Sequence, residues 1–293
     1  MMLAFRLLKD VRCGIGESPV WDDRRKVLFF VDIKAPAIHS IRLDGTEHRS
    51  WAMPKVVGSI GLGDSGRLVV ALERSIVVFD PDAGSLNVLA EVPGEPSWHR
   101  LNDGKVGPDG AFWVGSMDDR PQKEPRGSLY RVDGRGQVTR VLEHVCLVSN
   151  GLAWSADGLA MFHSDSRGPW IDRYDFELSS GRLSNRVRIA TLDEASGRPD
   201  GGACDAEGFY WSSGVSAGRL NRMTRDGEIV SSHPVPVPAP TMPCFCGDDL
   251  KTLVVTSLRP DKPDLLASAP QSGSLFIASS PMAGAPVGRW ADS

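Results

Sequence analysis

The chain has 293 residues, a formal net charge of −4 and no basic stretch, which argues against binding to nucleic acid or to an anionic membrane surface. No apolar run reaches about 18 residues, so a transmembrane helix is excluded. Arg6, Lys9 and Asp10 interrupt the N-terminus where a signal peptide would be apolar, and we expect a cytoplasmic protein whose five cysteines are reduced thiols.

Six short hairpins recur along the chain. Each consists of an apolar run, a turn rich in Asp and Gly, and a run of β-branched or aromatic residues. Successive turns are 41 to 50 residues apart. In chain order, the copies lie at 20–32, 62–73, 106–117, 153–165, 204–215 and 246–258.

Second hairpins lie between these copies, for example at 75–92, 127–145 and 218–235. Two hairpins per repeat give the four strands of a propeller blade, and blade repeats are typically about 40–50 residues long. Since no long window keeps a helical apolar period, we expect little helix. The sequence therefore predicts an all-β, six-bladed β-propeller that forms a single domain over residues 1–293. The Pro-rich stretch 234–243 is interpreted as the crossover between blades five and six.

Four copies carry an oxygen-donating side chain eight residues before the turn position: Glu17, Asn102, Asn150 and Asp200. Copies two and six carry Gly58 and Met242 there, which cannot bind a hard cation. Alone, each of the four has an ordinary explanation, because Asn-Gly and Asp-Gly form turns and a Glu before a strand is usually solvated. Together, at one height around one axis, two carboxylates and two amides predict a divalent-cation site with one side open.

Further polar residues surround this predicted ring. Arg100 precedes Asn102 by two residues and so shares its strand face, where it could bind substrate oxygens or form only a surface ion pair. Asp118 and Asp119 could bind substrate hydroxyls or be merely solvated. The motifs at 61–66 (GLGDSG) and 214–218 (GVSAG) precede strands, so neither the dinucleotide nor the serine-hydrolase interpretation holds.

Several segments together resemble one known family. The sequences GESPVWD, RLNDGKVGPDGAFWVGSM, SNGLAWSADG, RPDGGACDAEGFYW and TMPCFCGDDLKTLVVTS are similar, in order and spacing, to those of senescence marker protein (regucalcin), gluconolactonase and luciferin-regenerating enzyme. The resemblance extends from about residue 14 to residue 277. It implies a six-bladed propeller with one divalent cation on its axis, and a sugar lactone as the substrate.

The resemblance also implies roles for individual residues. The family's metal ligands correspond to Glu17, Asn150 and Asp200, and Asp200 would also be the catalytic general base. Asn102 corresponds to a position that contacts the metal directly or through water and substrate, and Arg100 to a substrate-binding arginine. The family commonly has a substrate-binding Glu after the third-blade strand. This chain offers Asp118 or Asp119 instead, which leaves the contacts to sugar hydroxyls open.

We therefore expect a metal-dependent lactonase that hydrolyses an aldonolactone to the aldonic acid. The cation, which could be Ca²⁺, Mg²⁺, Mn²⁺, Zn²⁺ or Fe²⁺, would polarise the lactone carbonyl while Asp200 or a metal-bound water activates the attacking water. The alternatives are a non-catalytic calcium-binding regulatory protein, a metal-dependent esterase or phosphotriesterase on the same site, and a propeller scaffold for protein partners. The sequence does not identify the sugar or the oligomeric state.

Overall fold

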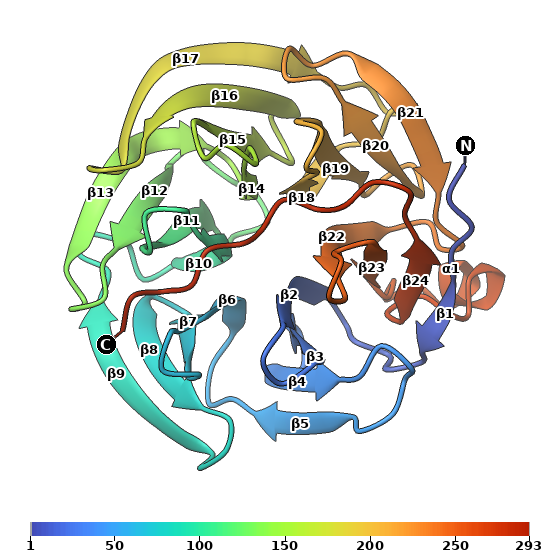
Figure 1. Cartoon of the computed structure of the whole chain (residues 1–293), viewed down its shortest axis with the longest axis horizontal. Coiled ribbons are helices and arrows are strands. Elements are labelled where there is room, and N and C mark those ends of the chain that lie inside the picture. The colour runs from blue at the N-terminus through green and yellow to red at the C-terminus, as the bar shows by residue number, and fades with distance from the viewer. Residues whose placement is uncertain (1, 293) are drawn as a thin grey trace.

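The computed structural model describes residues 2–292 and arranges them as six antiparallel sheets of four strands around one axis, which Figure 1 views end-on. The predicted six-bladed β-propeller is thereby confirmed. Blade one comprises β2 (Gly16–Asp22), β3 (Val27–Asp32), β4 (Ala37–Ile41) and β5 (Arg49–Ala52). Blade two comprises β6 (Val57–Leu62), β7 (Leu68–Leu72), β8 (Ser75–Asp80) and β9 (Ser85–Glu91). Blade three comprises β10 (His99–Val106), β11 (Phe112–Asp118), β12 (Gly127–Val132) and β13 (Val138–Cys146).

The remaining blades follow the same order from the axis outwards. Blade four comprises β14 (Ser149–Trp154), β15 (Ala160–Asp165), β16 (Trp170–Glu177) and β17 (Arg182–Thr191). Blade five comprises β18 (Pro199–Cys204), β19 (Tyr210–Gly214), β20 (Arg219–Met223) and β21 (Ile229–Pro234). Blade six comprises β22 (Pro240–Cys246), β23 (Thr252–Ser257), β24 (Leu275–Ser279) and, from the other end of the chain, β1 (Arg6–Lys9).

The ring is closed by strand β1. It pairs antiparallel with β24, and Arg6 lies opposite Ile277. The first and last parts of the chain therefore share one sheet. This pairing covers the edge that β24 would otherwise expose, because a closed array leaves few unpaired strand edges.

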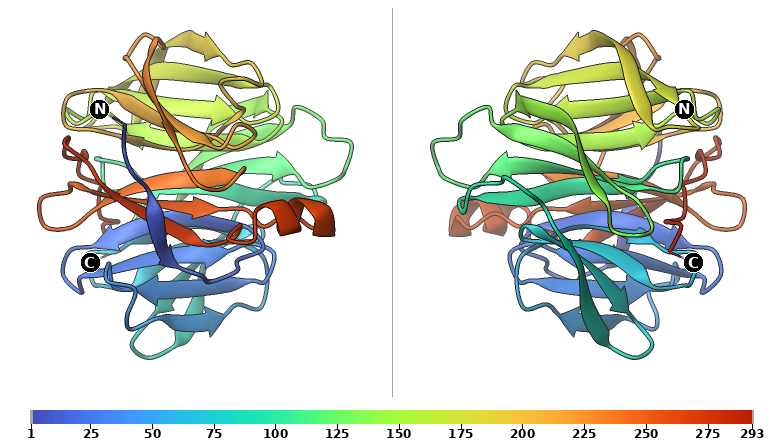
Figure 2. Two further views of the ribbon diagram at one scale, coloured as in Figure 1. Left: turned by 90° about the vertical axis from the view of Figure 1, so that its right-hand side faces the viewer. Right: turned by 90° about the vertical axis from the view of Figure 1, so that its left-hand side faces the viewer.

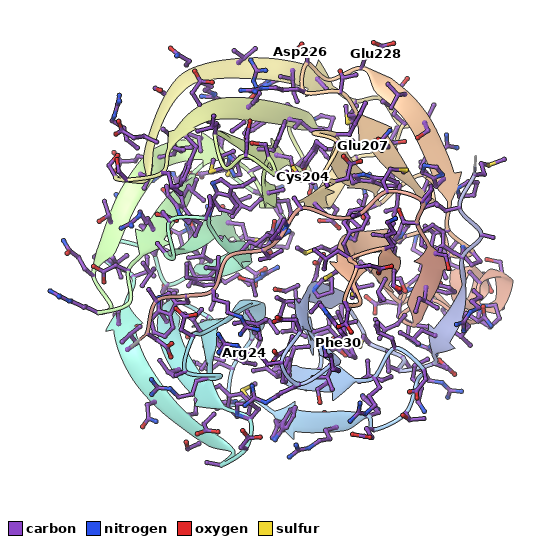
Figure 3. All side chains as sticks on the ribbon, viewed as in Figure 1. Arg24, Phe30, Cys204, Glu207, Asp226 and Glu228 are labelled. Carbon is purple, nitrogen blue, oxygen red and sulfur yellow. The ribbon has the colours of Figure 1, made fainter. Side chains whose placement is uncertain are left out.

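The hydrophobic core is divided between the blades. Within residues 2–292, six clusters of buried apolar side chains form, and each joins two neighbouring blades. Phe30, for example, belongs to the cluster between blades six and one, and Figure 3 shows how side chains fill the spaces between the sheets. The inner strands are buried on both faces, whereas β9, β13 and β17 are largely exposed. Burial thus holds the six inner strands around a narrow channel.

The two ends of this channel differ. At the end that we call the upper end, the inner strands β2, β10, β14 and β18 begin. At the lower end lie the hairpin turns, and the C-terminal segment 281–292 crosses them, as Figure 1 shows. Backbone N–H groups of Ala285, Trp290 and Ala291 donate to carbonyls of blades five, two and three. Figure 2 shows α1 (Pro263–Ser268) and this segment at opposite ends of the axis.

Two smaller points concern the connections. The crossover from blade five to blade six is shorter than expected, because β21 continues to Pro234 and β22 begins at Pro240. Among the described residues, no helix has the length and apolarity needed to span a membrane.

Candidate metal centre and lactone site

Four predicted ring residues lie on four different inner strands. Glu17 is on β2, Asn102 on β10, Asn150 on β14 and Asp200 on β18. Every inner strand has an irregularity in its pairing with the second strand of its blade. Glu17 and Asn150 are the last paired residues before it, whereas Asn102 and Asp200 lie within it. Because such bulges redirect side chains, residues from slightly different registers meet at one height.

The two amides are joined directly. Asn102 Nδ2 donates to Asn150 Oδ1 over 3.1 Å and to the Ser149 carbonyl over 2.9 Å. Asn150 Nδ2 in turn donates to Ser166 Oγ over 2.7 Å. Both side chains are buried, and these bonds fix their orientation. Asn150 Oδ1 accepts from Asn102 and Asn102 Oδ1 accepts from Arg100, so each amide oxygen keeps one further lone pair for a ligand.

The carboxylates of the ring repel one another in a buried setting. Burial raises the pKa of Glu17 well above its ordinary value, and the charges of Asp200 and Asp103 raise it further. Burial, followed by the charge of Asp103, likewise raises the pKa of Asp200, although Asp200 as a residue is partly exposed. Glu17 Oε2 accepts a 3.0 Å hydrogen bond from the Ser18 N–H. The ring is therefore richer in negative charge than its own hydrogen bonds can satisfy.

Asp103 is a third carboxylate that the sequence argument did not assign to the ring. It is 4% exposed, its Oδ2 accepts from the Leu152 N–H over 2.9 Å, and its Oδ1 has no partner among the described residues. Burial raises its pKa. Its position beside Asn102, inside the same bulge, was the available signal, because a bulge can turn two successive residues inward.

The donor set suits a divalent cation. Two carboxylates and two amide oxygens form the hard-oxygen environment that such ions prefer, and a cation would relieve the mutual repulsion of Glu17 and Asp200. Within residues 2–292, no group of three or more His, Cys, Asp or Glu side chains has metal-binding geometry. The set Glu17, Asn150 and Asp200 contains only two such side chains, so its amide is essential to the fit.

Two blades close the ring without contributing ligands. A Cβ on Gly58 would lie 2.5 Å from the Leu101 carbonyl oxygen, so β6 can approach β10 this closely only with glycine there. The Met242 side chain is buried against Gly201. Both positions therefore bring neighbouring inner strands together and leave the donors on the other four blades.

Arg100 extends from the ring towards the upper end. Its Nη1 donates to Asn102 Oδ1 over 2.7 Å, and its Nε donates to Asp119 Oδ1 over 3.1 Å. Burial lowers its pKa, and the charge of Asp119 opposes that shift. The guanidinium is thus held between the ring and a half-exposed carboxylate. It is well placed to meet an oxygen-rich ligand entering from above.

Asp118 and Asp119 have different environments. Asp118 is fully buried, and its carboxylate accepts hydrogen bonds from the Arg120 guanidinium and from the N–H groups of Arg120 and Glu124. The hydrogen bonds from Arg120 hold its pKa well below the ordinary value. Asp119 is 54% exposed at its side chain and contacts Arg100. Of the two, only Asp119 has oxygen atoms free to meet a ligand.

Comparison with known proteins gives this geometry a context. A family model described as the SMP-30/Gluconolactonase/LRE-like region matches residues 15–259. The chain belongs to this family. The match confirms the resemblance seen in the sequence, although it ends nearer the middle of blade six than we expected.

Individual members of the SMP-30/gluconolactonase/LRE-like family cover almost the whole chain. The chain is 36% identical over 264 residues to 6-deoxy-6-sulfogluconolactonase from Pseudomonas putida, covering 89% of this chain and 90% of that protein. It is 32% identical over 268 residues to regucalcin from Xenopus laevis, covering 89% of each. The crystal structure of regucalcin from Agrobacterium tumefaciens, described as a calcium-binding protein, superposes with a TM-score of 0.92 at 25% identity, covering 98% of this chain and 97% of that one.

Proposed function

We propose that the protein is a metal-dependent sugar lactonase that converts an aldonolactone to its aldonic acid. The observation that carries the proposal is the buried ring of carboxylate and amide oxygens, with Arg100 directly above it. Membership of a family that includes a sulfogluconolactonase supports the same reaction class. A carboxylate ring beside a fixed guanidinium suits a polar, uncharged ligand rich in hydroxyl groups.

The residues divide the work between holding a cation and holding the substrate. Glu17, Asn150 and Asp200 would bind a divalent cation, which supplies a Lewis acid for the lactone carbonyl. Asn102 and Arg100 would orient the substrate, because their mutual hydrogen bond already fixes both side chains. Asp119 would accept hydrogen bonds from sugar hydroxyls at the upper end.

The proton movements involve Asp200. Its carboxylate accepts a proton from water as the water oxygen attacks the lactone carbonyl carbon. The bond from that carbon to the ring oxygen then breaks, and the proton is delivered to the departing oxygen. The products are the carboxylic acid and a hydroxyl group, so that one water is consumed and no covalent enzyme intermediate is needed.

A non-catalytic calcium-binding protein is the second candidate. It is favoured by the relatives named regucalcin, one of which is described as calcium-binding. The same ring would serve both roles, so cation binding alone does not separate them. Turnover of a lactone does.

The deciding experiment measures acid release from a panel of aldonolactones. Protein treated with EDTA should be inactive, and one of Ca²⁺, Mg²⁺, Mn²⁺, Zn²⁺ or Fe²⁺ should restore activity. Asp200→Asn should lower kcat/KM at least about 100-fold, since a general base contributes that much and a ligand is weakened as well. Asp226→Asn, on an exposed turn of the same blade, is the matched control.

Two outcomes would count against the lactonase. Folded protein that releases no acid with any cation would favour the calcium-binding candidate. Full activity in Asp200→Asn would remove Asp200 as the general base, because an amide cannot accept the proton from the attacking water.

A further inference from the structure

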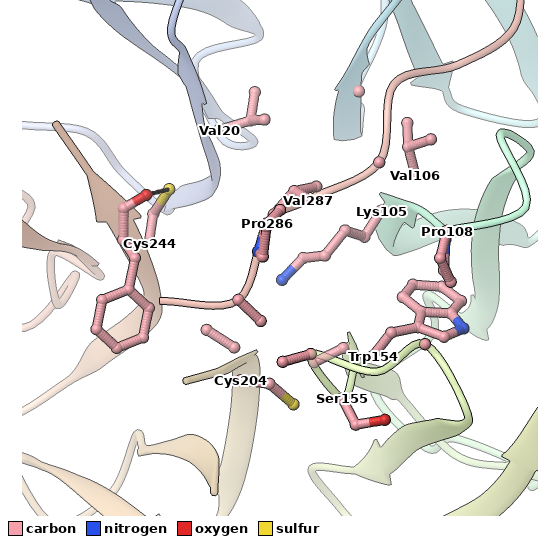
Figure 4. A pocket seen from close by; sticks show the side chains of 18 of the residues that line it. Val20, Lys105, Val106, Pro108, Trp154, Ser155, Cys204, Cys244, Pro286 and Val287 are labelled. Carbon is pink, nitrogen blue, oxygen red and sulfur yellow. Dashed lines mark hydrogen bonds between the residues drawn. The ribbon is translucent and has the colours of Figure 1, made fainter. Parts of the chain in front are cut away.

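A cavity lies below the oxygen ring, in the lower half of the channel. Its volume is about 320 Å³, and its lining contains none of the four ring residues. The C-terminal segment 281–292 contributes part of its wall through residues 285–288, as Figure 4 shows for Pro286 and Val287. The cavity thus shares no residue with the four oxygen donors, although Met242, at the same register on blade six, also lines it.

The wall of this cavity is mostly apolar. Val20, Val106, Trp154, Phe245, Pro286 and Val287 are among the side chains that line it. Leu178 and Val287, which also line it, are 48% and 44% exposed. Exposed apolar residues thus continue the buried wall to the surface. Such a surface favours contact with an apolar group over water.

One cationic group enters this apolar space. Lys105, on β10, directs its amine into the cavity among Cys204, Cys244 and Pro286 (Figure 4). Its Nζ donates one hydrogen bond of 2.6 Å, to the Gly202 carbonyl. An ammonium group has three N–H donors, and no other acceptor among the described residues bonds to Nζ, so two remain for a ligand.

Lys105 is the single basic residue among those that line the cavity. Asp157 is the other charged residue that lines the cavity, and it lies exposed in a turn, where its carboxylate accepts from Ser155 Oγ and the Leu159 N–H. Burial lowers the pKa of the Lys105 amine, and the charge of the Asp103 carboxylate opposes that shift. A ligand anion would also oppose it, from the cavity side.

We propose that the lower cavity is a second binding site, for a small apolar monocarboxylate. The carboxylate would pair with the Lys105 ammonium, and a hydrocarbon chain of roughly six to ten carbons would pack against the apolar wall, since about 320 Å³ is at the small end of ligand pockets. Leu178 and Val287 form the mouth. Unlike the oxygen ring, this site needs no metal.

Octanoate is the probe, and its binding to the full chain is measured by calorimetry after EDTA treatment and removal of the chelator. Saturable binding at one site is expected, at least tenfold tighter than binding of the uncharged comparator 1-octanol. No saturable binding, or equal affinity for the two probes, would overturn the proposal, because Lys105 would then contribute nothing.

Variants locate the site. Lys105→Met should weaken octanoate binding at least tenfold. Lys55→Met, which changes an exposed lysine just before β6, should leave the binding unchanged. Leu178→Asp places a negative charge at the mouth and should also weaken binding. Leu159→Asp is its matched control, because Leu159 is similarly exposed on the same blade but does not line the cavity. If Lys105→Met fails to fold, Leu178→Asp and Leu159→Asp still test the proposal. Equal octanoate affinity in these two variants would contradict the placement of the site in the lower cavity.

The octanoate carboxylate could instead bind a cation in the oxygen ring. A further comparison distinguishes binding there from binding in the lower cavity. Octanoate binding at the lower site should persist in metal-free Glu17→Gln protein and should not be displaced by glucono-lactone. Binding that requires added divalent cation would place the probe in the ring and reject the second site. This result is independent of whether the protein hydrolyses lactones.

Discussion

His163 connects the wall of blade four to the oxygen ring. Its Nε2 lies 2.8 Å from Ser149 Oγ, and the carbonyl of Ser149 accepts the hydrogen bond from Asn102. The imidazole of His163 is fully buried and meets the Trp170 side chain edge-on, with 5.6 Å between the ring centroids. Its Nδ1 has no partner among the described residues. A neutral imidazole therefore fits this place better than a charged one.

This burial predicts a dependence of stability on pH. Burial lowers the pKa of His163 from 6.5 to about 4. Between these values the unfolded chain binds the proton and the folded one does not, so the free energy of unfolding increases as pH rises from about 4 to 6.5. The contribution of one such group has a slope of up to about 1.4 kcal/mol per pH unit, and it is complete above pH 6.5.

Urea unfolding of His163→Gln across this range checks the prediction. Other histidines with a lowered pKa, such as the half-buried His39, contribute equally to both proteins, so the difference between the two curves isolates His163. The wild-type slope should exceed that of the variant, and exposed His144→Gln should match the wild type. Identical slopes for wild type and His163→Gln would mean that folding leaves the pKa of His163 unchanged.

At the scale of elements, the loop after β11 holds one side of the upper mouth. Arg120 donates to the buried Asp118 carboxylate, with Nη2 at 2.6 Å, and its guanidinium stacks 4.9 Å from the Trp98 ring centroid. Lys123 Nζ donates to the Asp118 carbonyl over 2.6 Å. These contacts fix the backbone beside Asp119, which in turn contacts Arg100.

Arg120→Ala should therefore affect substrate binding more than chemistry. Without the guanidinium, Asp119 and Arg100 lose a rigid support, and we expect KM for the lactone to rise about threefold to tenfold while kcat changes less than about twofold. Stability should fall only slightly, because Arg120 is 40% exposed and Asp118 keeps its backbone donors. The steady-state kinetics of Arg120→Ala are compared with those of Arg126→Ala, which changes an exposed arginine of the same loop. An unchanged KM in Arg120→Ala would show that the position of Asp119 does not depend on Arg120.

The same loop shows where sequence reasoning reaches its limit. The repeat period and the turn residues predict the blades, because each hairpin is encoded locally. The count of eight residues identified all four ring positions, but it did not show that Asn102 and Asp200 lie inside irregularities of the strand pairing. Whether a loop carboxylate meets a ligand or a neighbouring arginine depends on a contact that no period encodes, and so the sequence could not distinguish Asp118 from Asp119.

At the scale of the whole molecule, both ends of the chain complete the ring. Strand β1 closes blade six, and segment 281–292 ties blades two, three and five together across the lower end. Neither segment belongs to the repeat, which is why the repeat predicted a closed ring but not how it closes. The lower end is therefore held by side chains and backbone bonds of a segment without regular secondary structure.

Trp290 is the main apolar anchor of that segment. It is 1% exposed within the cluster between blades two and three, and its backbone N–H donates to the Leu62 carbonyl over 2.7 Å. Trp290→Ala should lower the free energy of unfolding by about 3–5 kcal/mol, the usual cost of truncating a buried tryptophan. Trp290→Phe should recover part of this loss, because the ring still fills most of the space.

Urea unfolding followed by circular dichroism measures these changes, and Trp98→Ala is the control. Trp98 is 44% exposed, so its truncation should cost less than about 1 kcal/mol. An equally small loss in Trp290→Ala would mean that the segment lies on the lower end without stabilising it. Since the same segment forms the wall beside Lys105, a Trp290→Ala protein that remains folded should also bind octanoate more weakly while its lactonase activity at the opposite end of the channel persists.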